Sequence, residues 1–281
     1  MVEHTSHLFV ISIILYFAGS LFALCFYGWQ RVGNYISLIL AAIASCFSIA
    51  TAVVALSDGL TIRLDFTVYH AIIKYNFLLD PVSTYFILAI SVIGFVAAVY
   101  SIGYTRLYVN KCDTRFLGFT YNIFLASMLL VVTANNAVVF MIVWELMTVV
   151  SFFLVIYEHE NPANMKAGFM YPIMAHIGAV LLSVAFFIMF AYTGTWDFGF
   201  DDFRKVGSHM PLIYKNVVFF LVIIGFGIKA GIFPLHLWLP MAHPAAPSNV
   251  SMVMSGVMIK TATYGFIRFY FEFLSPCPPW W

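Results

Sequence analysis

The chain has 281 residues, of which 63% are hydrophobic and 9% are charged, with a mean hydropathy of +0.97. Soluble globular proteins carry about 25% charged residues, so this composition excludes a water-soluble domain and indicates an integral membrane protein. The formal net charge of +1 gives no support for nucleic-acid binding, and the four cysteines lack metal-ligand or CxxC spacing.

The apolar runs along the chain have the length of membrane-spanning helices. A hydrocarbon core about 30 Å thick requires about 20 apolar residues in helical form, because backbone polar groups cannot remain unpaired in lipid. The runs also lack the alternation of β-barrel strands. We therefore expect an all-α, multi-pass protein of the cell (inner) membrane with about eight transmembrane helices, at residues 8–28, 35–57, 82–104, 116–134, 137–157, 168–191, 214–240 and 248–270.

Two connections and one helix end carry local patterns of their own. Residues 58–80 alternate between apolar and polar around Thr61–His70, which predicts a hairpin at the membrane surface. Residues 195–210, TWDFGFDDFRKVGSHM, mix aromatic and charged side chains and predict a short interfacial helix. Near the end of the last span, Arg268 and Glu272 are spaced i,i+4, so we expect them to form an ion pair.

Three ionisable residues fall near the middle of predicted spans: Glu145, Lys229 and Lys260. Each costs about 2.5–3.5 kcal/mol at a helix centre, so such residues usually face protein or water and mark ion pathways. One alternative is a Glu–Lys pair that only fixes helix packing, but it leaves a second lysine without a partner. Because burial disfavours a charged lysine and a nearby carboxylate favours it, a lysine that changes partners could bind and release a proton.

The seventh span is unusually rich in helix-breaking residues. Pro234 follows Lys229 by five residues, and Gly227 and Gly231 lie on either side of that lysine. Proline removes a backbone donor and clashes with the preceding turn, so we expect a broken seventh helix of the kind that transporters use for ion sites. The alternative is a simple kink in which Gly227 and Gly231 allow close helix packing.

Three histidines accompany these residues. His176 falls inside the sixth span, and His236 and His243 flank the broken segment. Imidazole titrates near neutral pH and suits a proton relay, although His176 could equally be neutral and hydrogen-bonded to a backbone carbonyl. With one histidine clearly mid-span, haem ligation is not expected, and we expect no cofactor or metal site within this chain.

The same residues carry a family resemblance. The stretch GFGIKAGIFPLHLWLPMAHPAAPSNVSMVMSGVMIKTATYGFIRF (225–269), with WELMTVVSFFLV (144–155) upstream, resembles the antiporter-like subunits of respiratory complex I and of Mrp cation/proton antiporters. AHIGAVLL in span six and PLHLWLPMAHPAAPS after span seven resemble the branch found in group 4 membrane-bound nickel–iron hydrogenases, which includes hydrogenase 4 and formate hydrogenlyase.

This resemblance implies a fold and a division of the chain. Residues 111–281 would form the antiporter-like repeat with helices 4–8, the first of two inverted repeats in the family, and residues 1–110 would supply helices 1–3 with the hairpin. Family members have about fourteen helices, so we expect that the chain is truncated at residue 281 or that another chain completes it.

The resemblance also implies roles. Glu145 and Lys229 would form an ion pair, Lys260 would continue the proton path, and His243 would lie near it. The chain would be a proton-translocating membrane-arm subunit of a redox-driven complex, without its own redox chemistry. Partner subunits would form the rest of the membrane arm and a peripheral hydrogenase or dehydrogenase arm that carries nickel–iron and iron–sulfur centres. The alternatives are a structural membrane anchor for the redox arm and a Na⁺/H⁺ antiporter subunit.

Overall fold

The computed structural model describes residues 2–26, 29–66, 75–108 and 111–281, and in these it confirms an all-α membrane fold. Eight helical segments of the described residues are long and apolar enough to cross a membrane. They are α1 (Val2–Cys25), α2 (Gln30–Ser57), α3 (Pro81–Tyr104, extended by the 3-10 turn η1, Thr105–Tyr108), α4 (Thr114–Thr133), α5 (Ala137–Val155), α6 (Pro162–Phe190), α8 (Leu212–Ala230) and a last span of α10 (Ser248–Val253), η2 (Met254–Met258), α11 (Ile259–Ile267) and η3 (Arg268–Phe273). The short helices are α7 (Phe200–Val206) and α9 (Leu239–Ala245).

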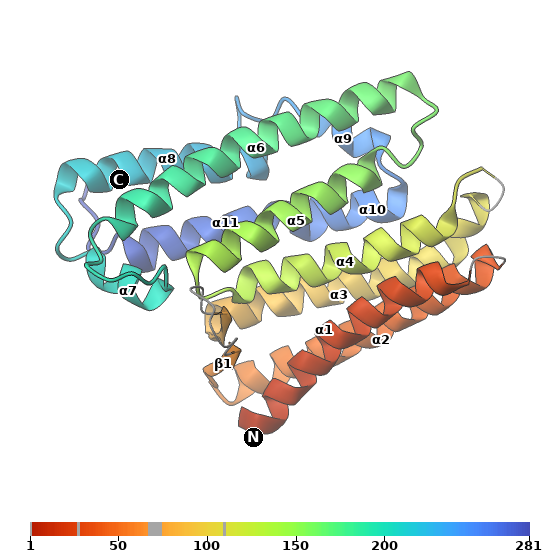
Figure 1. Ribbon diagram of the computed structural model, residues 1–281, viewed down its shortest axis with the longest axis horizontal. Coiled ribbons are helices and arrows are strands. Elements are labelled where there is room, and N and C mark those ends of the chain that lie inside the picture. Colours follow the sequence, from red (N-terminus) through yellow and green to blue (C-terminus); the bar gives the residue numbers. More distant parts are fainter. Residues whose placement is uncertain (1, 27–28, 67–74, 109–110) are drawn as a thin grey trace.

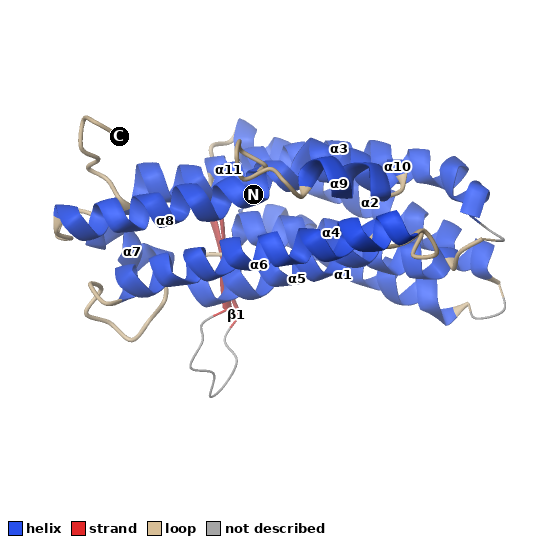
Figure 2. Cartoon of the chain, turned by 90° about the horizontal axis from the view of Figure 1, so that it is seen from above, coloured by secondary structure: helices blue, strands red, loops and turns tan. Residues whose placement is uncertain are grey.

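The spans form two layers of helices. Figure 2 shows α1, α4, α5 and α6 in one layer, and α2, α3, α10–α11 and α8 in the other. Neighbours within the first layer are α1 with α4, α4 with α5, and α5 with α6, while α1 packs on α2 and α6 packs on α8 across the layers. The broken segment around α8 and α9 therefore lies directly against α6 (Figure 1).

One end of the bundle carries the hairpin and the interfacial helix. Strands β1 (Ile62–Phe66) and β2 (Tyr75–Leu79) pair antiparallel within segment 58–80, while residues 67–74 of the expected hairpin, which include His70, lie outside the described residues. The short helix expected in 195–210 is confirmed as α7. Figure 1 shows both at the end where α5 begins. Single bridges join Phe77 to Ala134 and Asn136 to Gly199, which ties the two elements to the α4–α5 turn.

The predicted break in the seventh span is confirmed, and it shortens the helix expected over 214–240. Helix α8 ends at Ala230, and α9 begins only at Leu239. Gly231 has a φ of +69°, the left-handed conformation that glycine adopts without steric cost. Pro234 follows and cannot donate to a helical carbonyl, so counting apolar residues alone overestimates the length of this helix.

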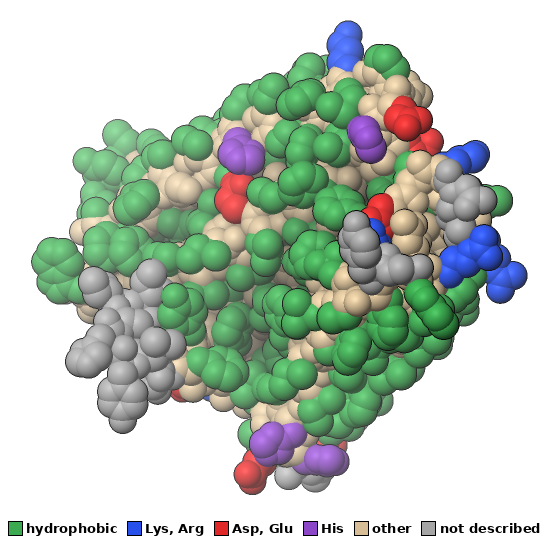
Figure 3. Space-filling model, turned by 45° about the vertical axis from the view of Figure 1, so that its right-hand side comes forward, with side chains coloured by type: hydrophobic (Ala, Val, Ile, Leu, Met, Phe, Trp, Pro, Cys, Tyr) green, Lys and Arg blue, Asp and Glu red, His purple; other side chains and the backbone are tan. Residues whose placement is uncertain are grey.

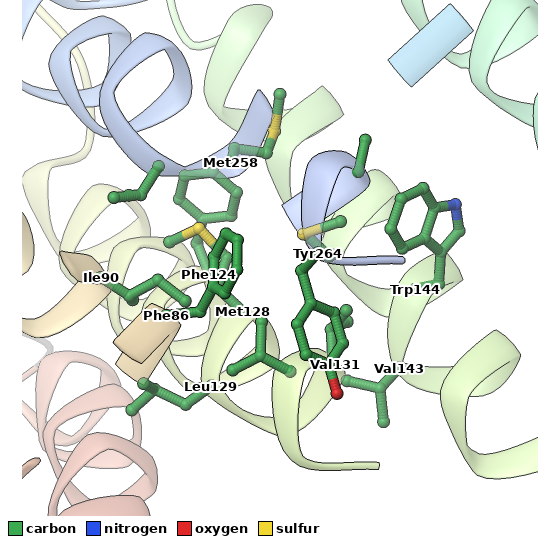
Figure 4. Packing of buried hydrophobic residues seen from close by; sticks show 14 of the residues in the cluster. Phe86, Ile90, Phe124, Met128, Leu129, Val131, Val143, Trp144, Met258 and Tyr264 are labelled. Atoms are coloured by element: carbon green, nitrogen blue, oxygen red, sulfur yellow. The ribbon is translucent and has the colours of Figure 1, made fainter. Parts of the chain in front are cut away.

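The core lies between the two layers and is aromatic and aliphatic. Figure 4 shows side chains of α3, α4, α5 and the last span packed together, with Phe86, Phe124, Trp144 and Tyr264 among them. The outer surface is apolar as well: in Figure 3 hydrophobic side chains cover most of the visible face, with few charged or histidine side chains among them. This is the surface that a lipid bilayer requires.

Candidate functional site

Lys229 lies in the last turn of α8 and is 2% exposed. Its Nζ donates hydrogen bonds to Oγ1 of Thr148 on α5 at 2.9 Å and to the hydroxyl of Tyr171 on α6 at 2.7 Å. The same Nζ lies 5.0 Å from the ring centroid of Tyr171 and 5.7 Å from that of Trp144. Two neutral hydroxyls and two aromatic rings thus surround the amino group, and they come from the layer opposite to α8.

The helix break creates a favourable place for a cation at this position. The backbone N–H of Ile232 bonds to the carbonyl of Gly227 at 2.9 Å, and Nε1 of Trp238 donates to the carbonyl of Ile228 at 2.7 Å. These bonds satisfy carbonyls that the end of α8 leaves unpaired. The carbonyl end of a helix favours positive charge, and Lys229 lies at that end of α8.

The hydroxyls around Lys229 continue as a short chain of hydrogen bonds. Ser151 Oγ lies 2.7 Å from the Tyr171 hydroxyl and also contacts the carbonyl of Met147 at 2.7 Å. A carbonyl only accepts, so Ser151 donates to Met147 and Tyr171 donates to Ser151. The Tyr171 oxygen is then free to accept from Lys229. This direction of donation gives each of the three groups, Lys229, Tyr171 and Ser151, a hydrogen-bond partner that accepts from it.

Glu145 lies on the same helix as Thr148 but faces another way. Its side chain is 33% exposed, and Oε2 lies 3.5 Å from Nε2 of His176 on α6. The expected pair with Lys229 is not formed: among the described residues, Lys229 has no carboxylate at ion-pair distance, and the partner of Glu145 is His176. The cause is helical geometry. Glu145 and Thr148 are three residues apart on α5, so their side chains differ by about 60° around the helix axis. Thr148 is the one that faces Lys229.

Lys260 lies in the second layer and does not join this cluster. Its side chain is exposed, and Nζ donates to the backbone carbonyl of Ser255 at 2.7 Å. Ser255 belongs to the π-helix η2, where the wider turn changes the hydrogen-bond pattern of the span. The amino group of Lys260 therefore points back along its own helix, and no contact partner is shared with Lys229 among the described residues.

The two histidines near the break have separate surroundings. His243 lies in α9, and its Nδ1 contacts Oγ of Ser251 on α10. His236 lies in the irregular segment beside Phe233, with 5.6 Å between the ring centroids. Its Nδ1 is buried and has no hydrogen-bond partner among the described residues. Among the described residues, neither histidine forms a hydrogen bond or an ion pair with Lys229.

The close packing expected of Gly227 and Gly231 is found instead at Gly225, two residues before Gly227. A Cβ added at Gly227 would meet Leu235 at an ordinary 3.4 Å, and Gly231 serves to end the helix. A Cβ added at Gly225 would lie 3.0 Å from the carbonyl oxygen of Gly178 on α6. Backbone contact between α6 and α8 therefore occurs at Gly225, because this glycine faces α6.

Charged side chains form a second cluster where the hairpin, α7 and the last span meet. The expected pair of Arg268 and Glu272 is confirmed, but Arg268 also contacts both carboxylate oxygens of Asp80. The network continues through Arg204, which lies 2.9 Å from Glu272 and 2.7 Å from Asp201. Burial alone would raise the pKa of Asp80, but hydrogen bonds and the charge of Arg268 lower the pKa of this carboxyl below its ordinary value.

The partners of Lys229, and the contact of Arg268 with Asp80, could not be read from the sequence. Thr148, Ser151 and Tyr171 are neutral residues of a kind common in membrane helices, and only the i,i+3 spacing of the first two hints at a polar stripe. Asp80 lies 188 residues from Arg268. Its position directly before Pro81 identifies it as a helix cap, a role that the Ser83 amide confirms at 2.8 Å, but not as an ion-pair partner.

The geometry can be compared with known proteins. The sequence model of the family described as "NADH:quinone oxidoreductase/Mrp antiporter, TM" matches residues 134–281, which contain the Lys229 cluster, Glu145 and Lys260. The chain is 36% identical over 272 residues to "Hydrogenase-4 component B" of Escherichia coli (strain K12), with 96% of this chain and 40% of that protein covered. It is 26% identical over 275 residues to "Formate hydrogenlyase subunit 3" of the same strain, with 97% and 40% covered.

A solved structure has the same arrangement of helices. A chain of the membrane-bound sulfane sulfur reductase, an archaeal respiratory membrane complex, superposes with a TM-score of 0.75 at 27% identity and covers 93% of this chain. This chain covers 40% of that one. The chain thus spans about two fifths of the length of these relatives. The similarity extends over nearly all of this chain.

Proposed function

The chain belongs to the NADH:quinone oxidoreductase/Mrp antiporter family, and on that premise we propose that it is a proton-translocating membrane-arm subunit of a redox-driven complex of the hydrogenase 4 or formate hydrogenlyase type. In this role partner subunits carry the nickel–iron and iron–sulfur centres, and this chain moves protons. The fold itself is that of a multi-pass membrane protein, which in bacteria lies in the inner membrane.

The observation that supports this function best is the state of Lys229. Lys229 is 2% exposed in a membrane span. A lysine in such a place costs free energy, so it is usually paired with an opposite charge or serves a function such as ion transport. Lys229 is held by two neutral hydroxyls and by the end of its helix, and among the described residues no carboxylate contacts it. Such an amino group can lose and regain a proton without breaking an ion pair, which suits a carrier of protons better than a packing device.

The other candidate residues come from helices of both layers. Glu145 and His176 come from α5 and α6 in one layer, and Lys260 comes from α11 in the other. We assign Lys229 the central position of the route, with Glu145 and His176 on one side and Lys260 on the other. His243 and His236 are assigned to the end of the route near α9. Water would connect these groups.

The test is a Lys229→Ala variant of the full complex, reconstituted in vesicles, with proton uptake measured per redox turnover. We expect uptake to fall below a tenth of the wild-type value. Lys205→Ala is the matched control, because this lysine is 77% exposed on α7 and forms a surface ion pair with Asp202. Unchanged uptake in Lys229→Ala, at normal assembly, overturns the function and leaves the subunit as a structural anchor.

A further inference from the structure

His176 has a fixed orientation that determines where its proton lies. Its Nδ1 is 2.8 Å from the backbone carbonyl oxygen of Pro172, one turn earlier in α6. A carbonyl oxygen accepts hydrogen bonds and cannot donate them, so Nδ1 carries a hydrogen. In the neutral imidazole the other nitrogen, Nε2, then presents a lone pair, and Nε2 is the atom that faces Oε2 of Glu145 at 3.5 Å.

Two lone pairs that face each other repel, and a proton bound by either group relieves this repulsion. With one proton, on either the imidazole or the carboxyl group, Glu145 and His176 together have zero net charge. Without it, the pair has a charge of −1. The exposed side chains around the pair on α5 and α6 are apolar, and they include Ile142, Val149, Ile173, Ile177 and Val180. Apolar surroundings disfavour net charge, so the state with one proton is favoured.

We propose that Glu145 and His176 form a dyad that holds a single proton, with the Pro172 carbonyl as the group that orients the imidazole. This inference rests on the proposed function and adds a second protonatable site to it. In the dyad, His176 takes the place beside Glu145 that the family resemblance assigns to Lys229. Glu145 is therefore free of Lys229 in the state that the structure describes.

The dyad and Lys229 are coupled because both connect α5 with α6, about one helical turn apart along these helices. On α5, Glu145 of the dyad lies three residues before Thr148, which binds Lys229. On α6, Tyr171, which also binds Lys229, directly precedes Pro172. When the dyad holds its proton it is neutral and gives Lys229 no compensating charge. When the dyad loses it, the negative charge favours a proton on Lys229. The dyad and Lys229 thus hold a proton alternately: when one site releases its proton, the other site binds one more strongly.

The test uses His176→Gln in the full complex in vesicles, with proton uptake measured across a pH series. Glutamine can still donate to Glu145 but cannot take up a proton, so we expect the pH midpoint of uptake to move by about one unit. The matched control is His7→Gln, which removes a histidine 4.0 Å from Glu3 in a solvent-exposed i,i+4 pair. It should leave the midpoint in place.

Two further measurements separate a dyad from a merely structural histidine. The double variant Glu145→Gln/His176→Gln should lose no more uptake than the more impaired single variant, because both changes disable one site. Nitrogen NMR of histidine-labelled complex should show one resonance of the Nδ1–H form that disappears in His176→Gln. Additive losses in the double variant, or a His176 ring protonated at Nε2 but not at Nδ1, overturn the dyad. An unchanged midpoint in His176→Gln overturns it as well, while the Lys229→Ala result decides the proposed function separately.

Discussion

Tyr171 on α6 accepts a hydrogen bond from Lys229 on α8, with 2.7 Å between the hydroxyl oxygen and Nζ. In Tyr171→Phe this acceptor is lost, while the ring beside Nζ and its packing against Trp238 remain. A hydrogen bond to a charged group contributes about 1.5–3 kcal/mol, so we expect the protonated lysine to be destabilised and proton uptake per turnover to fall about tenfold or more. Uptake in vesicles measures this.

Tyr16→Phe is the control for this variant. Tyr16 is also fully buried, and its hydroxyl bonds to Ser45 at 2.8 Å in α1 and α2, away from the Lys229 cluster. We expect it to lower stability and to leave uptake per assembled complex at the wild-type value. Equal losses of uptake in the two variants would show that the effect at Tyr171 comes from destabilised packing.

The contact between Asp80 and Arg268 predicts acid sensitivity. Asp80→Asn keeps the cap on α3, because asparagine also accepts from the Ser83 amide, but it removes the charge opposite a guanidinium that is 3% exposed. We expect a loss of about 2 kcal/mol in the free energy of unfolding at neutral pH, the contribution of hydrogen bonds to charged groups.

The pH window follows from the lowered pKa of Asp80. A carboxyl whose pKa is lower in the folded state stabilises the fold above its unfolded pKa of about 3.9, and this contribution is lost as the pH falls through the lower folded value. Thermal unfolding in detergent across an acidic pH series should therefore show the wild type approaching Asp80→Asn at the acid end. Asp65→Asn, an exposed change on β1, is the control and should follow the wild type throughout.

Much of this architecture follows from the sequence, and the limits have physical causes. Apolar runs of about 20 residues predict the spans, and the cost of a buried charge identifies Glu145 and Lys229 as unusual. Which of them meet depends on the rotation of α5, since residues only three positions apart face His176 and Lys229 respectively. Local sequence does not fix that rotation.

Contacts between segments that are distant in the sequence could not be predicted either. Arg268 was expected to pair with Glu272, four residues away, and it does so, but its contact with Asp80 requires the packing of the last span beside α3. The sequence likewise shows several glycines near Lys229, yet only the crossing of α6 over α8 selects Gly225 as the point of backbone contact.

Trp238 supports the break in the seventh span through a hydrogen bond that phenylalanine cannot make. In Trp238→Phe the carbonyl of Ile228 loses the Nε1 donor at 2.7 Å, and the packing of the indole on Tyr171 is reduced. A buried acceptor without its partner costs about 1–3 kcal/mol. We expect a lower thermal unfolding midpoint together with lower proton uptake, because Tyr171 and Ile228 flank Lys229. Trp196→Phe, at a side chain that is 94% exposed, should change neither quantity.

The backbone contact between Gly178 and Gly225 determines how near Lys229 comes to α6. A Cβ at Gly178 would lie 2.9 Å from the carbonyl oxygen of Gly225, and a backbone oxygen cannot turn away as a side chain can. Gly178→Ala should therefore separate α6 from α8, at a cost of about 1–3 kcal/mol for overpacking. The separation also lengthens the bond between Lys229 and Tyr171, so proton uptake should fall along with stability. Gly103→Ala is the control, since nothing lies within 4 Å of a Cβ at that position of α3, and it should leave both unfolding and uptake at or above wild-type values. Normal uptake in a destabilised Gly178→Ala variant would mean that the distance between α6 and α8 does not control Lys229.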